Sequence, residues 1–418
     1  MKTKTKFLLA MAVIASCVML FSCSEDDPAE LTLLSLTANG IDLNGATTPN
    51  NVPTNAVIVA TFSTAVNPTT AEANIILTRD YDDAIVPLDV EVAGNVITIT
   101  PTAPFGTGTL FSLSLAPGLA STEGKTIAPA DRTFTTEGTF AVAGAIAHWT
   151  FEDNANDVIG TFDPAANQIV GITYVNSRNA ASGKAASFNG TTSIIEVSNG
   201  SALMNNGDWT LSFWVNASSV DKTTGHFVMG LGAFYGFQFE IAGDYSNCKL
   251  AASYAHTKEA NGTTSEDLWF PGDGKDRNNG GWQGWDFVRD LSTSGGVANL
   301  LKDKWAHVVC MYNATTKQGV MYINGQRMKS QDFDLWPDGD AKRFVTGLKY
   351  RGVAPEVVNE LAFGFIQSRA GTLWDAEPWG GYDQTTANHF KGLMDDVIIY
   401  HKTLSEAEIG LMYNSGKP

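Results

Sequence analysis

Short β-type runs separated by turn-forming residues constrain the fold of this chain more than any other feature. Thr109–Leu115 alternates apolar and polar residues with period two, and Ala56–Phe62, Asn95–Thr100 and Trp209–Val215 are runs of similar length. Gly, Pro and Asn separate such runs, and the chain holds 40 Gly and 15 Pro. Because a run of this kind buries one face against a second sheet, the sequence predicts an all-β fold built from β-sandwiches.

Length and charge exclude several classes of protein. At roughly 150 residues per domain, a chain of 418 residues is expected to form two or three domains. The chain has 27 Lys and Arg against 44 Asp and Glu, a net charge of −17. Proteins that bind nucleic acids need clustered cations to neutralise phosphates, so we expect no nucleic-acid partner. The 44% of hydrophobic residues can bury a core, which excludes disorder along the whole chain.

The first residues are typical of a bacterial export signal. Three lysines lie within the first six residues and precede the apolar run Phe7–Ser22, which is too short for a comfortable membrane span. We predict a signal peptide at residues 1–22. The run ends in the letters LFSC, which resemble a bacterial lipobox, and that resemblance implies a lipid on Cys23. An ordinary secretory signal cut near the same place is the alternative.

Acidic residues follow Cys23 directly, and we assign residues 23–30 to an acidic tether. The letters SEDD resemble the tether by which some Gram-negative gut bacteria send lipoproteins to the outer face of the outer membrane. A solvated linker without such an address is the alternative. No later segment reaches 18 apolar residues, so the lipid is the expected membrane contact and the expected location is the outer membrane, facing the cell exterior.

Residues 31–137 carry the pattern of one β-sandwich and contain no His, Cys or Trp. They resemble the bacterial Ig-like domains of S-layer and envelope proteins. The fragments that carry this resemblance are Asn51–Ser63, Ile99–Pro101, Leu119–Gly124 and Arg132–Thr136. The resemblance implies a spacer without a pocket of its own.

A Gly- and Ala-containing linker at residues 138–145 precedes a larger β domain at residues 146–418, which holds all ten Trp and all six His. This domain is similar to laminin G-like domains of the concanavalin A-like lectin/glucanase superfamily, and the resemblance implies a jelly roll of two sheets. The carrying fragments are Trp149–Asp153, Ala186–Gly190, Trp209–Val215, Trp305–Val309, Tyr322–Gly325 and Phe390–Ile409. Ser405 and Glu408 stand at the capping-box positions of one short helix that closes the domain.

Two cysteines, Cys248 and Cys310, remain beyond the signal and the anchor. Cys310 lies in a strand-like run, which favours buried free thiols, although an oxidising envelope also permits a disulfide. His307 matches a strand position of the family and is expected to be a packed, hydrogen-bonded core residue. Neither cysteine has a neighbour at zinc-ligand spacing.

Catalysis is not expected from the sequence. A retaining glycosidase needs two carboxylates roughly 5–5.5 Å apart, which one strand supplies from alternate positions. No such run occurs, and Asp395 and Asp396 are adjacent, so we expect their side chains to point to opposite faces. The nucleophile motif Gly-x-Ser-x-Gly is also absent. A pair of carboxylates assembled from separate loops stays open as an alternative.

The superfamily resemblance implies a structural calcium ion. Its positions correspond here to Glu152 or Asp153 after the first strand, the carbonyl of Gly190, and Asp395 near the last strand. Oxygen ligands of this kind suit Ca²⁺. The alternative is that Asp395 only hydrogen-bonds a neighbouring turn.

The domain is longer than a plain laminin G module, and the excess falls in residues 244–302 and 329–389, which we expect to be long loops rich in aromatic residues. Sugars offer apolar faces and a rim of hydroxyls, so a glycan site needs flat rings beside forked polar groups. The expected ligand-binding residues are Trp282, Trp285, Asp286, Trp374, Asp375, Trp379 and Tyr382. The alternative is that these rings pin the loops to the sandwich.

Together these features predict a surface-anchored, non-catalytic lipoprotein that captures an extracellular glycan, beside a polysaccharide uptake system. The partners would be the glycan, the outer-membrane lipid through Cys23, and an uptake-system protein. Two alternatives stay open at this point. One is an adhesin or envelope assembly partner that binds a protein, and the other is a glycoside hydrolase.

Overall fold

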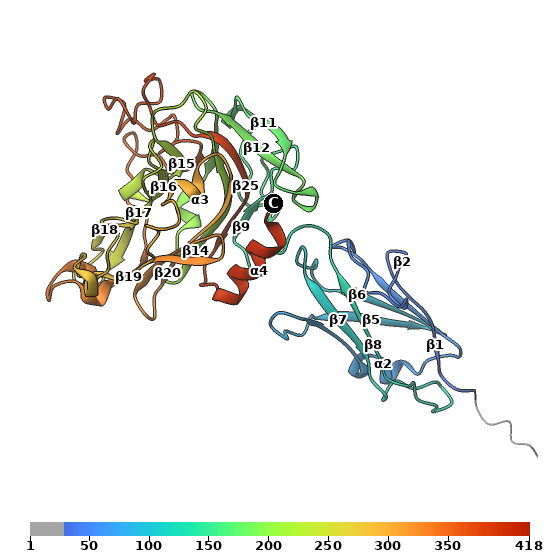
Figure 1. Ribbon diagram of the computed structural model, residues 1–418. Coiled ribbons are helices and arrows are strands. Elements are labelled where there is room, and N and C mark those ends of the chain that lie inside the picture. Colours follow the sequence, from blue (N-terminus) through green and yellow to red (C-terminus); the bar gives the residue numbers. More distant parts are fainter. Residues whose placement is uncertain (1–28) are drawn as a thin grey trace, which may run out of the picture. The chain divides into compact units, whose positions relative to one another are not determined.

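The computed structural model describes residues 29–418, which fall into two compact units (Figure 1). The first unit ends at Thr136 and excludes Gly106–Thr109, while the second comprises that short segment and Glu137–Pro418. The signal peptide, the lipidation site Cys23 and most of the acidic tether lie outside the described residues. Within the described residues no helix has the length and apolar character that a membrane crossing requires.

The first unit is a sandwich of two antiparallel sheets around one apolar core. One sheet has the order β2 (Ile41–Asp42), β1 (Leu33–Ala38), β3 (Ile58–Phe62), β6 (Val96–Pro101) and β5 (Leu88–Ala93). The other sheet has the order β4 (Ile75–Arg79), β7 (Leu110–Leu115) and β8 (Ala130–Thr135), and a short helix α2 (Pro68–Asn74) precedes β4. In β7 the alternate residues Phe111, Leu113 and Leu115 are buried, as the period-two pattern predicts.

The second unit is built from two larger antiparallel sheets. The eight-stranded sheet has the order β10 (Ile169–Val170), β13 (Ile194–Ser198), β24 (Glu360–Phe363), β15 (His226–Gly230), β16 (Phe237–Ile241), β17 (Cys248–His256) and β18 (Thr263–Phe270), and β23 (Val345–Leu348) pairs with β17. The nine-stranded sheet has the order β11 (Thr173–Asn176), β12 (Lys184–Asn189), β25 (Lys391–Tyr400), β14 (Trp209–Ala217), β20 (Trp305–Asn313), β21 (Gln318–Ile323), β22 (Gln326–Asp332) and β19 (Trp285–Val288), and β9 (Ala147–Trp149) pairs with β25.

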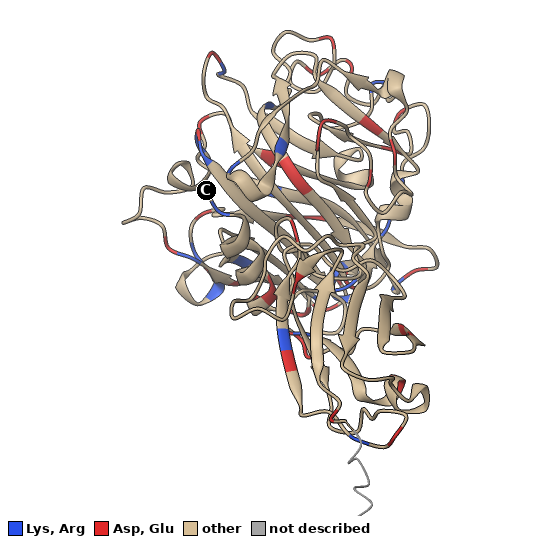
Figure 2. Cartoon of the chain, turned by 90° about the vertical axis from the view of Figure 1, so that its right-hand side faces the viewer, with Lys and Arg blue, Asp and Glu red and all other residues tan. Residues whose placement is uncertain are grey.

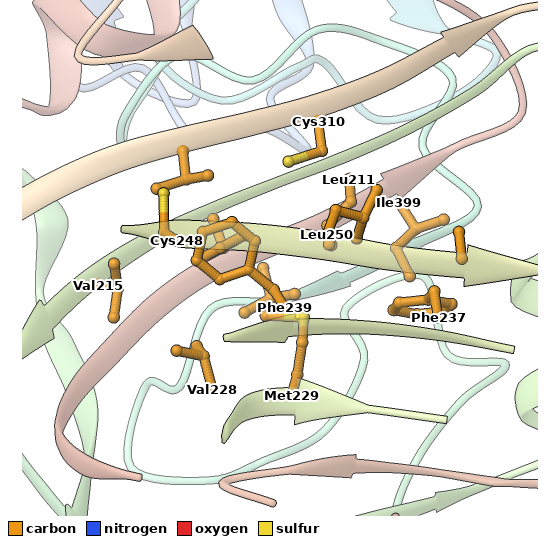
Figure 3. Close-up of a cluster of buried hydrophobic side chains, with 14 of the residues drawn as sticks. Leu211, Val215, Val228, Met229, Phe237, Phe239, Cys248, Leu250, Cys310 and Ile399 are labelled. Atoms are coloured by element: carbon orange, nitrogen blue, oxygen red, sulfur yellow. The ribbon is translucent and has the colours of Figure 1, made fainter. Parts of the chain in front are cut away.

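One apolar core joins the two sheets of the second unit. Phe213 of β14 meets Phe239 of β16 with ring centroids 5.0 Å apart, and the two rings stand edge to face. Cys248 and Cys310 lie in this core as buried free thiols, so that prediction is confirmed (Figure 3). The predicted all-β fold of two sandwiches with one short C-terminal helix is also confirmed.

The expectation of two long aromatic loops is wrong. Residues 244–302 contain β17, β18, β19 and a short helix α3 (Ala298–Leu301), and residues 329–389 contain most of β22 together with β23 and β24. In β17 small residues are buried on both faces, so this strand lacks the alternation that reveals a half-buried strand. Trp269 therefore stands on β18 and Trp285 on β19.

The terminal helix α4 (Glu406–Gly416) forms as predicted. The Ser405 side chain accepts a hydrogen bond from the Glu408 amide, and the Glu408 side chain accepts one from the Ser405 amide. Tyr413 of α4 stacks on Trp214 of β14 with ring centroids 6.0 Å apart. His307 also stacks on Trp214, with ring centroids 5.0 Å apart. It is buried and hydrogen-bonded to Ser212 at 2.9 Å, as predicted for a core histidine.

A buried ionic cluster ties β25 to the segment after β11. Arg178 donates hydrogen bonds to both Asp395 and Asp396, and its guanidinium lies 4.4 Å from the Trp214 ring centroid. The expectation that the two acids point to opposite faces is wrong, because β25 carries a β-bulge here and Asp396 has a positive φ of 42°. The bulge turns both carboxylates toward one cation.

Loss of this cation should destabilise the second unit strongly. Arg178→Met removes the guanidinium from the buried Asp395 and Asp396 carboxyl groups, and breaking a buried ion pair in this way typically costs about 3–5 kcal/mol. We expect a matching fall in the free energy of unfolding of the second unit, measured by denaturant titration. The triple variant Arg178→Met/Asp395→Asn/Asp396→Asn should recover part of the loss, because it removes the uncompensated charges.

The control for this experiment is Asp338→Asn, since Asp338 pairs with Arg343 at the surface with its side chain 99% exposed. A surface pair of this kind contributes about 0–1 kcal/mol. If Arg178→Met were as mild as this control, the cluster would not be a stabilising element.

Candidate functional site

The three residues expected to hold calcium do not converge. Asp395 is fully buried and accepts hydrogen bonds from Arg178 and Ser177, so its oxygens face a guanidinium and a hydroxyl. Gly190 follows the strand position that pairs with Lys391, which places it about 13 Å along β25 from Asp395 at ~3.3 Å per residue. Glu152 accepts hydrogen bonds from the Lys184 amide at the opposite end of β12. These residues do not fit a calcium ion, and among the described residues no group of three His, Cys, Asp or Glu side chains could hold a metal.

Burial and mutual repulsion set the protonation of the two acids. Burial and the neighbouring charge of Asp396 raise the pKa of the Asp395 carboxyl well above its ordinary value. Burial acts in the same direction on Asp396, but hydrogen bonds from His148 and Arg178 outweigh it and lower the pKa of that carboxyl. One guanidinium thus stabilises mainly one carboxylate charge, which is an arrangement for stability rather than for binding a divalent cation.

The expected ligand-binding residues separate into two groups over different sheets. Trp282, Trp285 and Asp286 belong to the edge of the nine-stranded sheet at β19. Trp285 is only 9% exposed, and the Lys329 ammonium lies 3.1 Å from its ring centroid. Asp286 accepts hydrogen bonds from Ser330 and Gln318. Trp285 and Asp286 therefore have their main contacts within the sheet edge, and their assignment as ligand-binding residues stays a prediction.

Trp282 differs from its neighbours because it is 47% exposed. Its ring stands edge to face against Trp336 with centroids 6.4 Å apart, and Trp336 in turn is buried and stacked on Phe333. Trp282 thus offers a single exposed ring.

The second group forms a pocket over the outer face of the eight-stranded sheet, which we call the Trp374 pocket. Its volume is about 270 Å³, and its lining residues are Phe227, Ala233, Phe234, Gln238, Glu240, Lys249, Ile366, Trp374, Trp379 and Asn388. The Trp374 and Trp379 rings stand edge to face at 6.1 Å, and Trp379 rests on Phe227 at 6.0 Å. The rings of Phe227, Trp379 and Trp374 therefore make one continuous wall of the pocket, and Trp374 also contacts Tyr235, outside the lining, at 6.2 Å.

Backbone hydrogen bonds hold the loop that carries the two tryptophans. The Leu373 amide donates to the Glu356 carbonyl at 3.0 Å, and the Asn388 amide donates to the Trp379 carbonyl at 2.9 Å. The Thr386 hydroxyl donates to the Pro378 carbonyl at 2.6 Å. The backbone that carries the two rings is therefore held in position by the chain itself, without a ligand.

Charged and amide side chains form the floor of the Trp374 pocket. Gln238 and Glu240 alternate with the buried Phe237, Phe239 and Ile241 along β16, so both face outward. The Gln238 amide donates to Glu240 at 2.6 Å. These groups lie beside the aromatic wall, which is the combination of flat rings and forked polar groups that a sugar requires.

One lysine lies between two carboxylates on this face. The Lys249 ammonium is 3.4 Å from Glu240 and 3.4 Å from Asp267. Burial raises the pKa of both carboxyls, while Lys249 opposes that shift. Burial alone would lower the pKa of Lys249, but the two carboxylates outweigh it and raise the pKa, so the ammonium stays charged.

Asp375 and Tyr382 line a second hollow next to the same loop. This hollow encloses about 480 Å³ and is also lined by Arg369, Gly381, Asp383 and Gln384. The Tyr382 hydroxyl donates to the Thr192 carbonyl at 2.6 Å, and Arg369 pairs with the buried Glu196.

Figure 2 shows acidic and basic positions interspersed along the described chain.

The polar floor of the pocket was missed by the sequence analysis. The signal for Gln238 and Glu240 was present, because the run FQFEI places both on the face opposite its apolar residues. Lys249 gives no such signal, because it lies in residues 244–302, for which the sequence predicts a loop. Phe227 and Asn388 carry no local motif, and only the fold brings them to Trp379.

Comparisons with known proteins identify the first unit only. Residues 41–136 match the family described as the bacterial Ig-like domain, which confirms that resemblance over those residues. No curated protein matches the chain. The laminin G-like resemblance of the second unit stays a prediction.

Solved structures give remote matches. The binding domain of Paraclostridial Mosquitocidal Protein 1 has 15% identity and a TM-score of 0.40, with 65% of this chain and 52% of that chain covered. The receptor binding domain of botulinum neurotoxin type G has 12% identity and a TM-score of 0.37, with 66% and 54% covered. The binding domain of botulinum neurotoxin serotype D has 13% identity and a TM-score of 0.38, with 65% and 51% covered. The chain spans about half the length of these structures, and likeness this low identifies neither a ligand nor a family.

The buried Lys329 makes the stability of the second unit depend on pH. Burial lowers the pKa of Lys329 to about 7, far below the ~10.4 of an unfolded lysine. Between these values the unfolded chain binds more protons, so this lysine makes stability rise with pH. Lys329→Met should therefore raise the melting temperature of the second unit at about pH 7, and the gain should shrink toward about pH 10.

Differential scanning calorimetry across this range measures the effect. Lys304→Met is the control for the loss of a lysine side chain, because Lys304 is exposed at the surface. If Lys329→Met raised the melting temperature by the same amount at every pH, the lysine would not be neutralised by folding.

Proposed function

We propose that this protein is a non-catalytic glycan-binding protein that captures extracellular carbohydrate in the Trp374 pocket. The observation that carries the proposal is the pocket itself, in which two tryptophan rings stand beside the amide of Gln238 and the charged groups of Glu240 and Lys249. Aromatic rings pack against the apolar faces of sugars. The polar groups accept hydrogen bonds from the sugar hydroxyls and donate hydrogen bonds to them.

The partial exposure of Trp379 supports this function. Its ring is 41% exposed although it lies in a loop held by several hydrogen bonds. A ring that served only to pin the loop would gain more free energy from full burial. An ordered but exposed ring at the mouth of a pocket is suited to a ligand.

The position of Lys249 favours binding without hydrolysis. Glycosidases place the scissile bond between two carboxyl groups. Between Glu240 and Asp267 the space is taken by the Lys249 ammonium, which contacts both. A sugar that entered would meet an ion pair rather than a free acid and a free base.

The place of the protein in the cell belongs to the same proposal. A lipid on Cys23 would hold the chain at the outer face of the outer membrane, and the Ig-like unit would carry the pocket away from the lipid. Capture at that position would supply a polysaccharide uptake system with its substrate.

Removal of either pocket tryptophan should weaken glycan capture. We expect electrophoresis of the full chain through gels that contain plant, host or microbial polysaccharides to be retarded by one class of glycan. Trp374→Ala and Trp379→Ala should each weaken this binding by about tenfold or more, which corresponds to ~1.4 kcal/mol. Trp282→Ala is the control, because the exposure of Trp282, 47%, is close to the 41% of Trp379, and Trp282 lies just before β19 at the edge of the other sheet.

The same gels discriminate the other functions. Release of reducing ends would overturn the non-catalytic proposal and favour a glycoside hydrolase. No retardation by any glycan would overturn carbohydrate capture and favour a protein partner. EDTA should leave retardation unchanged, because the expected calcium ligands do not converge.

A further inference from the structure

The floor of the Trp374 pocket continues across the sheet as one row of side chains. Phe227 of β15 pairs with Glu240 of β16, Glu240 pairs with Lys249 of β17, and Lys249 pairs with Trp269 of β18. Residues directly opposite each other in antiparallel strands point to the same face. The row therefore has an aromatic ring at each end and an ion pair in the middle, and its four strands lie side by side in Figure 1.

Trp269 lies outside the lining of the pocket but is continuous with it. Its ring is 39% exposed on β18, an edge strand, and its direct neighbour Lys249 lines the pocket. The row spans three strand spacings of about 4.8 Å each, or about 14 Å, from Phe227 to Trp269. Trp379 rests on Phe227 and extends the aromatic surface at that end.

Carboxyl groups outnumber ammonium groups in the ion pairs along the row. Glu240 and Asp267 both pair with Lys249, so two carboxyl groups face one ammonium in this ion-pair group. Arg351 lies beside the pocket, where it stacks on Tyr235 and donates to the Phe234 carbonyl, but it is exposed to solvent, which screens its charge. An anionic sugar such as a uronate would therefore meet repulsion at the floor.

We propose that an uncharged, extended glycan chain lies across β15, β16, β17 and β18, with sugar rings on Trp379 at one end and on Trp269 at the other. This inference rests on the proposed function and adds the class of glycan and the direction of the chain. Two aromatic rings that are separated by polar groups, Trp379 and Trp269, would bind a stretch of several sugars. A site for a single sugar or a chain end would need only the pocket.

Oligosaccharide length tests the inference directly. Isothermal titration calorimetry of the full chain would use malto-, cello-, xylo-, manno- and chito-oligosaccharides from disaccharides upward, with oligogalacturonates as the charged counterpart. Affinity should rise with length until the oligomer spans the row. Trp269→Ala should lose about tenfold in affinity for long oligomers and little for disaccharides, whereas Trp374→Ala should weaken both.

Two further variants separate binding from folding. Trp269→Tyr keeps a ring at this position and should retain most of the affinity for long oligomers, and Trp282→Ala should behave like the parent chain. Melting temperatures of all variants show whether the second unit is intact.

The outcomes separate the inference from the proposed function. If Trp374→Ala loses binding while Trp269→Ala has no effect that depends on length, glycan capture stands and the extended site is overturned. Tighter binding of oligogalacturonates than of neutral oligomers overturns the uncharged class. Absence of binding to every series overturns the proposed function and the inference together.

Discussion

Packing between the inner faces of the two large sheets determines what the outer face can present. Phe237, Phe239 and Ile241 of β16 enter the core, so Gln238 and Glu240 must face outward. Antiparallel pairing then aligns Glu240 with Lys249 and Trp269 on the neighbouring strands. A slip of one residue in any of these strands would exchange the core residues for the polar ones, so the apolar core fixes the register of the pocket floor.

Arg178 stabilises the nine-stranded sheet through a buried ionic cluster rather than through apolar packing. The superfamily resemblance suggested that a divalent cation would neutralise Asp395, but a guanidinium from the chain's own sequence takes that position. The same arginine lies against Trp214, on which Tyr413 of the terminal helix also stacks. The ionic cluster and the helix thus share one aromatic ring, next to the bulge in β25 that turns two acids inward.

The sequence was most informative where burial alternates. It predicted the all-β class, the capped helix at Ser405 and the buried thiols, because each of these depends on neighbours in the chain. It failed at β17, where burial on both faces erased the alternation, and at Asp395 and Asp396, where a bulge changed the side-chain directions. The pocket combines Phe227, Lys249 and Asn388, which lie far apart in the sequence, so only tertiary structure could bring them together.

Composition alone could not distinguish structural aromatic rings from binding ones. Trp285 and Trp374 stand in similar surroundings of Gly and Asp, yet Trp285 is buried against Lys329 whereas Trp374 lines a pocket. The two tryptophans differ in the space that is left beside each indole ring. At Trp285 the backbone of Gly272 approaches so closely that an added Cβ would lie 2.7 Å from the ring, which leaves no space for a ligand. Gly380 also lies close to Trp374, but the Trp374 and Trp379 rings, which stand edge to face at 70°, both line the open Trp374 pocket.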